Sequence, residues 1–327
     1  MPDATTRKPA RAALRAAMEA ALMLGPLAVW LFISTGALMP ECPRRNFSGA
    51  VTDRIALARP DVFRLAVLSD AHNNFRVMDA VMRDAQSRAD AALELGDFSQ
   101  RGLIIEYRLY LEHMLGAGWK IPVYTALGNH DLGFWDDTGN LFRETFGPDH
   151  FSWSCGDNLI VVSNNVEKER WPAEIEWLKD TLKGRVPGKG TVLLLQHKPP
   201  YLDAEFPGMT LGSSDKLAKV VRGRVDAIVA GHAHEHREFK WSGAPVTVLA
   251  SAGGWQEADP PQYGYLLIEC GERECKSAYH EVGYVAPGPQ IAKILLVDCY
   301  WGWLILSLAA ASMIVVFYLR KRRSISS

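Results

Sequence analysis

The sequence predicts an α/β domain placed between two apolar segments, and three observations lead to this fold class. From about residue 62, short apolar runs alternate with longer amphipathic stretches. Acidic, amide and imidazole side chains recur just after several of the short runs, and an uncharged apolar stretch lies near each end of the chain. With 48% apolar and 22% charged residues among 327, the chain can bury a substantial core, which excludes a wholly disordered protein.

The alternation of runs sets the expected order of the secondary-structure elements. We expect strands over residues 62–68, 91–95, 122–127, 159–162, 191–195 and 226–230, and helices over 74–88, 103–115, 172–182 and 214–221. Strand and helix in alternation favour an open, largely parallel sheet covered by helices on both faces. Three later runs without intervening helices predict an antiparallel addition to that sheet, at residues 246–250, 262–269 and 276–282.

The apolar segments, residues 20–39 and 299–319, have the length of a membrane-spanning helix. Basic residues flank each segment on its outer side, and four in a row follow the second, from Arg320 to Arg323. Such clusters tend to stay in the cytoplasm, which places both termini there and the body of the chain outside the cytoplasmic membrane. A cleavable signal peptide is the alternative for the first segment. However, Met39 to Cys42 forms neither a small-x-small cleavage site nor a lipid-attachment sequence.

We therefore expect four parts and a lipid bilayer as a partner. They are a cytoplasmic tail with the first transmembrane helix (1–40), a linker (41–60), the globular domain (61–285) and the second transmembrane helix with its basic tail (286–327). Lysine plus arginine number 36 against 37 acidic residues, so no broad basic field predicts a nucleic-acid polymer as a partner. Cys270 and Cys275 flank four residues between two strand-like runs. They form either a disulfide across a hairpin or a pair of reduced thiols.

Five of the expected strands are followed by residues that can bind a metal ion. These residues are Asp70 and His72, then Asp97, then Asn129 with His130 and Asp131, then His197, and finally His232 and His234. In open α/β sheets, ligands bind beyond the carboxyl ends of the strands, so these side chains should meet at one edge. Singly, each has an ordinary explanation as a helix cap, a turn residue or a surface histidine. Caps and turns do not explain the paired Asp-x-His and His-x-His or the recurrence at five strand ends.

In order and spacing, the series Asp-x-His, Gly-Asp, Gly-Asn-His-Asp, His and Gly-His-x-His resembles the signature of the calcineurin-like metallophosphoesterases. The resemblance covers about residues 62–284 and implies a four-layer α/β/β/α sandwich with a two-metal site at the strand ends. It implies one metal held by Asp70, His72, Asp97 and His234, and a second held by Asp97, Asn129, His197 and His232. It also assigns the role of general acid to His130, with Asp131 orienting its imidazole.

The predicted ligands also suit this chemistry on physical grounds. Carboxylate, amide and imidazole ligands together favour first-row divalent metals over calcium or a cysteine-rich zinc site. We expect manganese, with iron, zinc or nickel as alternatives. Two neighbouring cations need a shared anion, which Asp97 can supply, and together they would acidify a water molecule and stabilise charge on a phosphoryl group.

Three further residues lie near these motifs without belonging to them. His236 extends the Gly-His-x-His run, and we expect it behind the ligands or at the surface. Tyr201 and Trp255 either line a substrate cleft or pack within their own loops.

The resemblance and the terminal segments together predict a membrane-anchored phosphoesterase. We expect it to hydrolyse a phosphomonoester, phosphodiester or pyrophosphate bond in a lipid-linked or membrane-proximal substrate. One alternative is a phosphodiesterase that acts on a soluble nucleotide such as a cyclic nucleotide. Another is a non-catalytic receptor on the same fold, which would be marked by lost ligands, and none is missing from the pattern.

Overall fold

The computed structural model describes residues 62–283 with gaps at 134–135, 168, 186–187 and 201–213. It also describes residues 285 and 307–315 and four single positions between 20 and 28. The chain divides into two compact units, one made of Met1–Pro40 with Pro289–Ser327 and the other of Glu41–Gly288. The second unit contains all the strands that the structure describes and the site presented below.

The two segments expected to span a membrane lie mostly outside the described residues, as does the expected linker at 41–60. Of the second segment, only the helical stretch 307–315 is described. In the part of the chain that the structure describes, no helix combines the length and apolar character needed to cross a bilayer.

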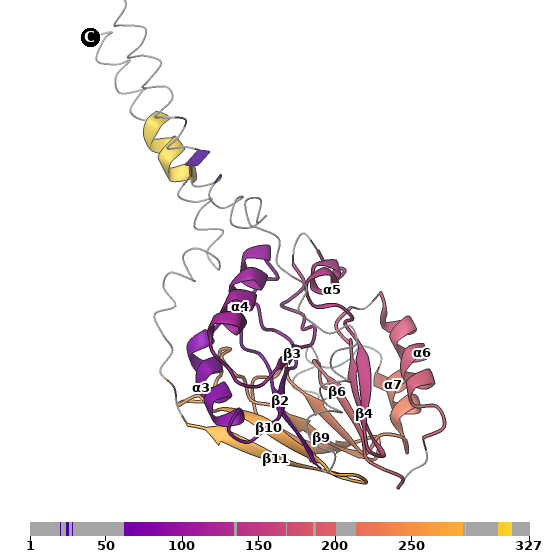
Figure 1. Ribbon diagram of the computed structural model, residues 1–327. Helices are drawn as coiled ribbons and strands as arrows, with labels where there is room; N and C mark the ends of the chain where they lie inside the picture. The colour runs from indigo at the N-terminus through magenta and orange to yellow at the C-terminus, as the bar shows by residue number, and fades with distance from the viewer. Residues whose placement is uncertain are drawn as a thin grey trace, which may run out of the picture. The chain divides into compact units, whose positions relative to one another are not determined.

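The globular unit contains two sheets (Figure 1). The first has the order β11-β10-β1-β2-β3 and consists of β1 (Phe63–Leu68), β2 (Ala91–Glu94), β3 (Val123–Thr125), β10 (Tyr263–Cys270) and β11 (Cys275–Val282). The second has the order β4-β5-β6-β7-β9-β8 and consists of β4 (Phe151–Cys155), β5 (Asn158–Ser163), β6 (Val192–Gln196), β7 (Ala227–Ala230), β8 (Arg237–Trp241) and β9 (Ala244–Val248). In the first sheet, the parallel strands β1, β2 and β3 are extended on one side by the antiparallel strands β10 and β11. In the second, the parallel strands β5, β6, β7 and β9 lie between the antiparallel edge strands β4 and β8.

Side-chain alternation along the strands explains how the layers pack. In β1, Leu65 and Val67 belong to the apolar cluster between the two sheets, whereas Ala66 and Leu68 belong to the cluster beneath the helices. This follows from the period of two in a strand, which sends successive side chains to opposite faces. Because both faces are buried, β1 is apolar at almost every position.

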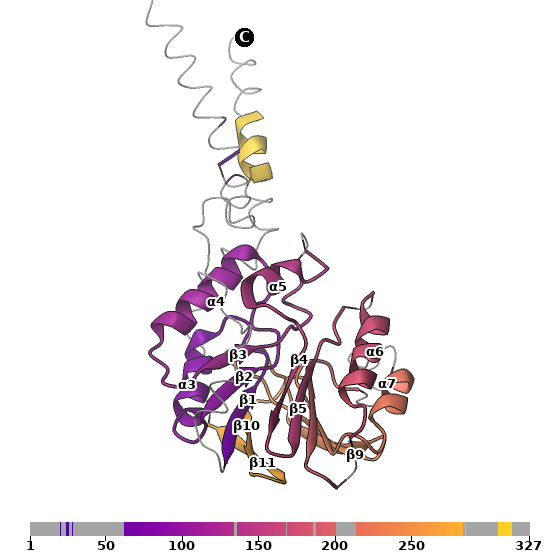
Figure 2. The same ribbon diagram turned by 45° about the vertical axis from the view of Figure 1, so that its right-hand side comes forward.

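Helices cover the outer face of each sheet. The first sheet carries α3 (Phe75–Ala85), α4 (Ile104–Gly116) and the short α5 (Asn140–Phe146), and the second carries α6 (Trp171–Thr181) and α7 (Ser214–Val221). Figure 2 shows α3 and α4 on one side and α6 and α7 on the other, with the sheets between them. The fold is therefore a mixed α/β sandwich of two sheets.

The expectation of a single open sheet was wrong, whereas the two-sheet arrangement implied by the resemblance is confirmed. The expectation for residues 246–250 was also wrong, because β9 pairs in parallel with β7 in the second sheet. Strand β9 is antiparallel only to the edge strand β8, since these two strands form a hairpin and β9 lies between β8 and β7. The antiparallel addition of β10 and β11 to the first sheet is confirmed.

Of the two alternatives for Cys270 and Cys275, the structure contains the disulfide, at the end of the β10–β11 hairpin. The loop it closes contacts the turn between β4 and β5. There, the side-chain amide of Asn158 donates to the carbonyl of Gly271 at 2.7 Å, and the N–H of Asp157 donates to the carbonyl of Glu272 at 2.8 Å. The hairpin thereby connects the two sheets at the end opposite the strand-end motifs.

Candidate metal centre

Left-handed backbone conformation is concentrated at the strand ends that carry the motifs. Six of the seven non-glycine residues with positive φ in the described part of the chain are Asp70, His72, Asn73, Asp97, His232 and His234. Each such residue costs of the order of 1–3 kcal/mol and persists only where the surrounding structure enforces it. This concentration of strain at the carboxyl ends of strands from both sheets indicates a functional site.

Backbone hydrogen bonds join the strand-end loops to one another. The N–H of Asp70 donates to the carbonyl of Gly96 at 3.0 Å, and the N–H of His72 donates to the carbonyl of Asp97 at 2.9 Å. The N–H of Gly231 likewise donates to the carbonyl of His197 at 2.9 Å. The loops therefore position the predicted ligands as a connected group.

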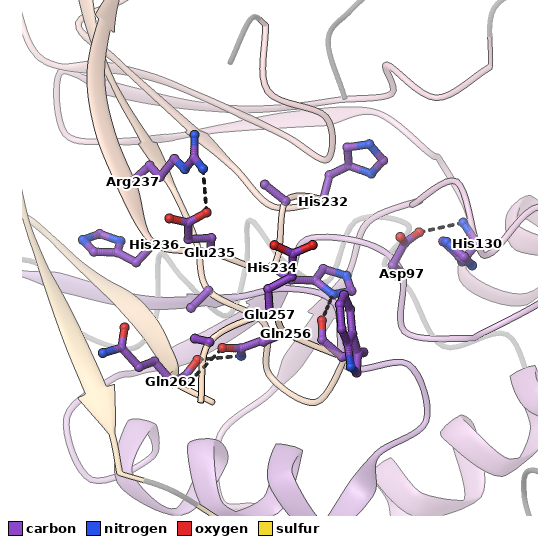
Figure 3. A pocket seen from close by; sticks show the side chains of 14 residues that line it. Asp97, His130, His232, His234, Glu235, His236, Arg237, Gln256, Glu257 and Gln262 are labelled. Carbon is purple, nitrogen blue, oxygen red and sulfur yellow. Dashed lines mark hydrogen bonds and ion pairs between the residues drawn. The ribbon is translucent and has the colours of Figure 1, made fainter. Parts of the chain in front are cut away.

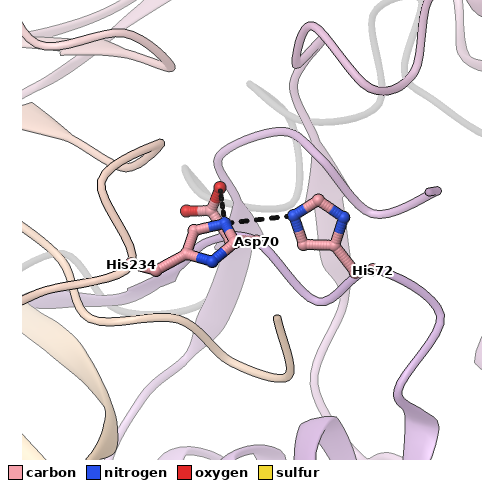
Figure 4. A group of neighbouring side chains, drawn as sticks. All are labelled: Asp70, His72 and His234. Carbon is pink, nitrogen blue, oxygen red and sulfur yellow. Dashed lines mark hydrogen bonds and ion pairs between the residues drawn. The ribbon is translucent and has the colours of Figure 1, made fainter. Parts of the chain in front are cut away.

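The first cluster consists of Asp70, His72 and His234 (Figure 4). Nε2 of His234 lies 3.2 Å from Oδ1 of Asp70 and 3.1 Å from Nε2 of His72. One potential ligand atom from each residue lies within 4.8 Å of the others. Asp70 and His72 are buried, so water does not replace these contacts.

The second cluster consists of Asp97, His197 and His232, whose potential ligand atoms also lie within 4.8 Å of one another. Nε2 of His197 lies 3.2 Å from Oδ2 of Asp97 and 3.2 Å from Oδ1 of Asn129. Asn129 therefore lies at this cluster, as expected. Nε2 of His232 is buried and has no hydrogen-bond partner among the described residues.

Asp97 lies between the two clusters. Its Oδ2 is 3.2 Å from Nε2 of His197 and 3.8 Å from Nε2 of His72, which belongs to the other cluster. Its Oδ1 accepts the backbone N–H of His130 at 2.7 Å. The carboxylate is thus placed where a ligand shared by two cations would stand.

Backbone carbonyls orient two of the imidazoles. Nδ1 of His197 donates to the carbonyl of Leu95 at 3.0 Å, and Nδ1 of His234 donates to the carbonyl of Trp255 at 2.5 Å. Because a carbonyl can only accept, each ring directs Nε2 into the site, as metal-binding histidines do. Sequence reasoning missed both carbonyls because a main-chain ligand leaves no signature in residue identity.

Burial and neighbouring charges shift the titration of these groups. Burial would raise the pKa of Asp97, but His197 and His72 hold it at about 2. Burial lowers the pKa of His72 to about 4 and that of His232 to about 3. For His197, burial lowers the pKa, but Asp97 outweighs it and raises the pKa to about 9.

These residues fit two divalent cations. Oxygen and imidazole donors without thiolate are the set that first-row divalent metals prefer. In the first cluster, two imidazole nitrogens and a carboxylate oxygen converge within hydrogen-bond range, and a cation would satisfy all three lone pairs at once. Binding would displace protons from the rings whose pKa is raised.

His130 lies beside the first cluster. Its ring is edge-on to that of His72, with 4.9 Å between centroids, and it lines a cavity together with Asp97. Its Nδ1 donates to the carbonyl of Gln100 at 2.8 Å. The remaining nitrogen, Nε2, is the one that can exchange a proton with a bound molecule.

The structure corrects the predicted role of Asp131. This buried carboxylate does not bond the His130 imidazole, which the Gln100 carbonyl orients instead. Its Oδ2 accepts the backbone N–H of Asp97 and of Gly128, both at 2.8 Å. Its Oδ1 accepts the N–H and the hydroxyl of Ser99, both at 2.9 Å. Asp131 therefore fixes the loop that carries Asp97.

A cavity of about 630 Å³ opens from the site (Figure 3). Asp97 and His130 lie at one end of it, and His236 and Gln262 lie at the other. His236 stacks on Tyr279 at 3.8 Å, and its Nδ1 donates to the carbonyl of Val248 at 3.1 Å. Trp255 lines the cavity, whereas Tyr201 lies outside the described residues.

Comparison with known proteins agrees with this geometry. A family model for "Calcineurin-like phosphoesterase" matches residues 63–236. A "Probable cyclic nucleotide phosphodiesterase" of Rhodococcus erythropolis is 26% identical over 230 residues, which cover 64% of this chain and 72% of that protein. The bovine "Serine/threonine-protein phosphatase CPPED1" is 28% identical over 151 residues, covering 41% of this chain and 48% of its own length.

A purple acid phosphatase from yellow lupin has the same fold, with a TM-score of 0.56 at 12% identity. The superposition covers 70% of this chain and 53% of the lupin enzyme. The family match covers more than half of the chain and includes both ligand clusters. This chain therefore belongs to the calcineurin-like phosphoesterase family and is a metal-dependent hydrolase of phosphoric esters.

Proposed function

We propose that this phosphoesterase cleaves its substrate at a dinuclear centre in which Asp97 bridges two divalent cations. Asp70, His72 and His234 complete one site, and Asn129, His197 and His232 complete the other. The observation that carries the proposal is the position of Asp97, whose Oδ2 faces a histidine from each cluster at 3.2 and 3.8 Å. We expect manganese in both sites.

The protein's own residues supply orientation and a proton. When bound, the cations supply positive charge for the phosphate oxygens and lower the pKa of water at the site. His130 lines the cavity beside Asp97, and the Gln100 carbonyl fixes its Nδ1. Its Nε2 can therefore deliver a proton to the leaving oxygen, the task of a general acid.

We further propose that the substrate is lipid-linked or lies close to a membrane. The apolar segments near both ends of the chain and the basic clusters beside them support this proposal. They also support a location in the cytoplasmic membrane, with both termini in the cytoplasm. In spheroplasts, protease should then reach a tag placed in residues 41–60 but not a tag after Ser327. The reverse pattern would contradict the proposed topology.

A soluble cyclic nucleotide is the second candidate substrate. It is favoured by the relative from Rhodococcus, which carries the name of a cyclic nucleotide phosphodiesterase and aligns over 72% of its length. On this hypothesis the apolar segments would only determine where the enzyme is located. A non-catalytic receptor is disfavoured because every ligand of the family pattern is present.

The test is a substrate panel with the purified full-length protein in detergent micelles and manganese. Hydrolysis would be followed by the ³¹P NMR signal of each product. The substrates are a phospholipid diester and cyclic AMP, which would each give a phosphomonoester, a lipid phosphomonoester, which would give phosphate, and a lipid pyrophosphate such as CDP-diacylglycerol, which would give two phosphomonoesters. We expect at least one of the lipid-linked esters to be cleaved, with Asp97→Asn as the control for contaminating hydrolases. Cleavage of cyclic AMP alone would replace the first substrate candidate with the second.

A further inference from the structure

Trp255 has the most exposed side chain among the large apolar residues of the globular unit that the structure describes. Its exposed fraction is 76%, although it lines the cavity that opens from the candidate metal centre. Covering a solvent-exposed indole with a ligand is favourable, because its large apolar faces are then removed from water. The side chain therefore contributes little to the packing of the loop and is available to a bound molecule.

The backbone on both sides of Trp255 is held in place. The N–H of Gly254 donates to the carbonyl of Asp70 at 2.8 Å, and the carbonyl of Trp255 accepts from His234 at 2.5 Å. The side chain of Gln256 forms two bonds with the backbone of Gln262, at 2.6 and 2.8 Å. An exposed indole on a fixed backbone loses little entropy when a ligand covers it.

The cavity beyond the indole has polar walls. Glu235 and Arg237 form an ion pair at 2.7 Å on one side, and Gln262 and His236 lie at the far end (Figure 3). An acyl chain there would remove water from these groups without offering hydrogen bonds, which is unfavourable. A flat heteroaromatic ring offers both a face for the indole and polar edges for the walls.

From this geometry we propose that Trp255 determines specificity by stacking on a planar heteroaromatic group, such as a nucleobase, carried by the substrate phosphate. The cavity volume of about 630 Å³ is in the usual range for small-molecule sites. The inference rests on the proposed phosphoesterase function and narrows its substrates to nucleoside-bearing esters. Such an ester is either a free nucleotide or a nucleotide linked to a lipid, and both present the same ring.

The test uses two esters that release the same nitrophenolate and differ only in the group that remains on the phosphate. They are thymidine 5′-(4-nitrophenyl) phosphate and methyl 4-nitrophenyl phosphate, assayed with the full-length protein and manganese. Trp255→Ala should lower kcat/KM for the thymidine ester roughly 5- to 100-fold, the effect of losing one base–aromatic stack. It should lower kcat/KM for the methyl ester much less, and Trp255→Phe should recover most of the loss.

Metal content separates stacking from damage to the site. Trp255 contributes only its carbonyl to His234, so Trp255→Ala should keep its bound metal. Leu115→Ala, which removes another exposed apolar side chain (52%) from α4, is the matched control and should change neither ester. Equal losses on both esters, or no loss on either, would overturn the proposal.

Titration with thymidine 5′-monophosphate keeps the proposal testable if neither ester is turned over. Failure of turnover would count against the proposed function, whereas equal affinity of the wild type and Trp255→Ala would count against stacking. CDP-diacylglycerol in mixed micelles then separates the two sources of the ring. Preferential cleavage of this lipid over the free nucleotide esters would identify a lipid-linked nucleotide.

Discussion

Asp131 accepts the backbone N–H of Asp97 at 2.8 Å through Oδ2, so one buried carboxylate positions another. The same oxygen accepts from Gly128, and Oδ1 accepts from both the backbone and the hydroxyl of Ser99. Four donors thus converge on Asp131 and fix the loop from which Asp97 reaches both clusters. Burial, together with Asp97, raises the pKa of Asp131 to about 7.

We therefore expect Asp131→Asn to weaken metal binding, because its amide group would face backbone N–H donors that need an acceptor. Loss of such an outer contact typically costs 10- to 100-fold in metal affinity. Competition dialysis with mass-spectrometric metal analysis would measure the change. The exposed Asp137→Asn is the control. Full metal affinity in Asp131→Asn would show that this carboxylate is not needed to position Asp97 for metal binding.

Asp97→Asn should weaken both metal sites, since Oδ2 of this carboxylate faces an imidazole from each cluster. Asp70→Asn should mainly affect the site of His72 and His234. We expect metal content in Asp97→Asn to fall from about two ions per chain to below about one, with loss of activity. Two tightly held ions in the purified variant would remove Asp97 from the bridging position.

Gly254 lies against both imidazoles of the first cluster, and replacing it should disturb that cluster alone. A Cβ at this position would lie 2.6 Å from Cε1 of His234 and 2.7 Å from Cδ2 of His72, closer than carbon atoms approach. Gly254→Ala should therefore lose one metal and retain the other. The control is Gly116→Ala, because a Cβ there meets no atom within 4 Å. Loss of both metals would show that the clusters do not bind independently.

A histidine outside the site gives a pH-dependent test of stability. Nδ1 of His150 lies 2.5 Å from Oε2 of Glu174, and its ring stacks on Trp177 at 4.1 Å. Burial lowers the pKa of His150, but Glu174 outweighs it, so the folded-state pKa lies above the ordinary 6.5. The charged pair thus stabilises the fold fully below about pH 6.5, and this contribution is lost as the pH rises through the raised folded-state pKa.

His150→Gln should accordingly lower the free energy of unfolding by about 1 kcal/mol at acidic pH and by less at alkaline pH. Urea unfolding of the metal-free protein at about pH 5.5 and about pH 9 would measure this. Metal-free protein is used because the lower pH would otherwise release bound metal, so that the two pH values would compare proteins with different metal content. All other titrating groups are the same in the wild type and in His150→Gln. The difference between their free energies of unfolding at each pH therefore reports on His150 alone. A difference independent of pH would contradict the charged pair.

The metal-binding residues at the strand ends could be predicted from the sequence, because each of them closely follows an apolar run that is typical of a buried strand. The structure places Asp70, Asp97 and His232 in the two clusters that these positions suggest. The role of Asp131 could not be predicted, because its partners are mainly backbone N–H groups that every residue carries.

The division into two sheets depends on pairings between distant parts of the chain. Strand β1 pairs with β10, with Phe63 opposite Cys270, and no local pattern encodes this register. Strands β4 and β8 were missed because each is an edge strand with half-exposed, polar positions. Local apolar runs therefore revealed most buried strands but not the assignment of strands to sheets.

We expect His130 to act as the proton donor for the leaving oxygen. A donor matters in proportion to how poor the leaving group is, because a stable anion departs without protonation. An alkoxide is a poor leaving group, whereas a nitrophenolate is stable near neutral pH. His130→Ala should therefore lower turnover of an alkyl phosphoester by roughly 10²–10⁴-fold and turnover of a nitrophenyl ester much less.

Metal content should stay unchanged in His130→Ala, because the contact of this residue with Asp97 is made by its backbone N–H, which the substitution retains. His236→Ala is the matched control, since that ring also lines the cavity but stacks on Tyr279 at the far end. A loss that is equal for both leaving groups would mean that His130 positions the phosphate or the metals. A leaving-group-dependent loss in His236→Ala instead would make that residue the proton donor.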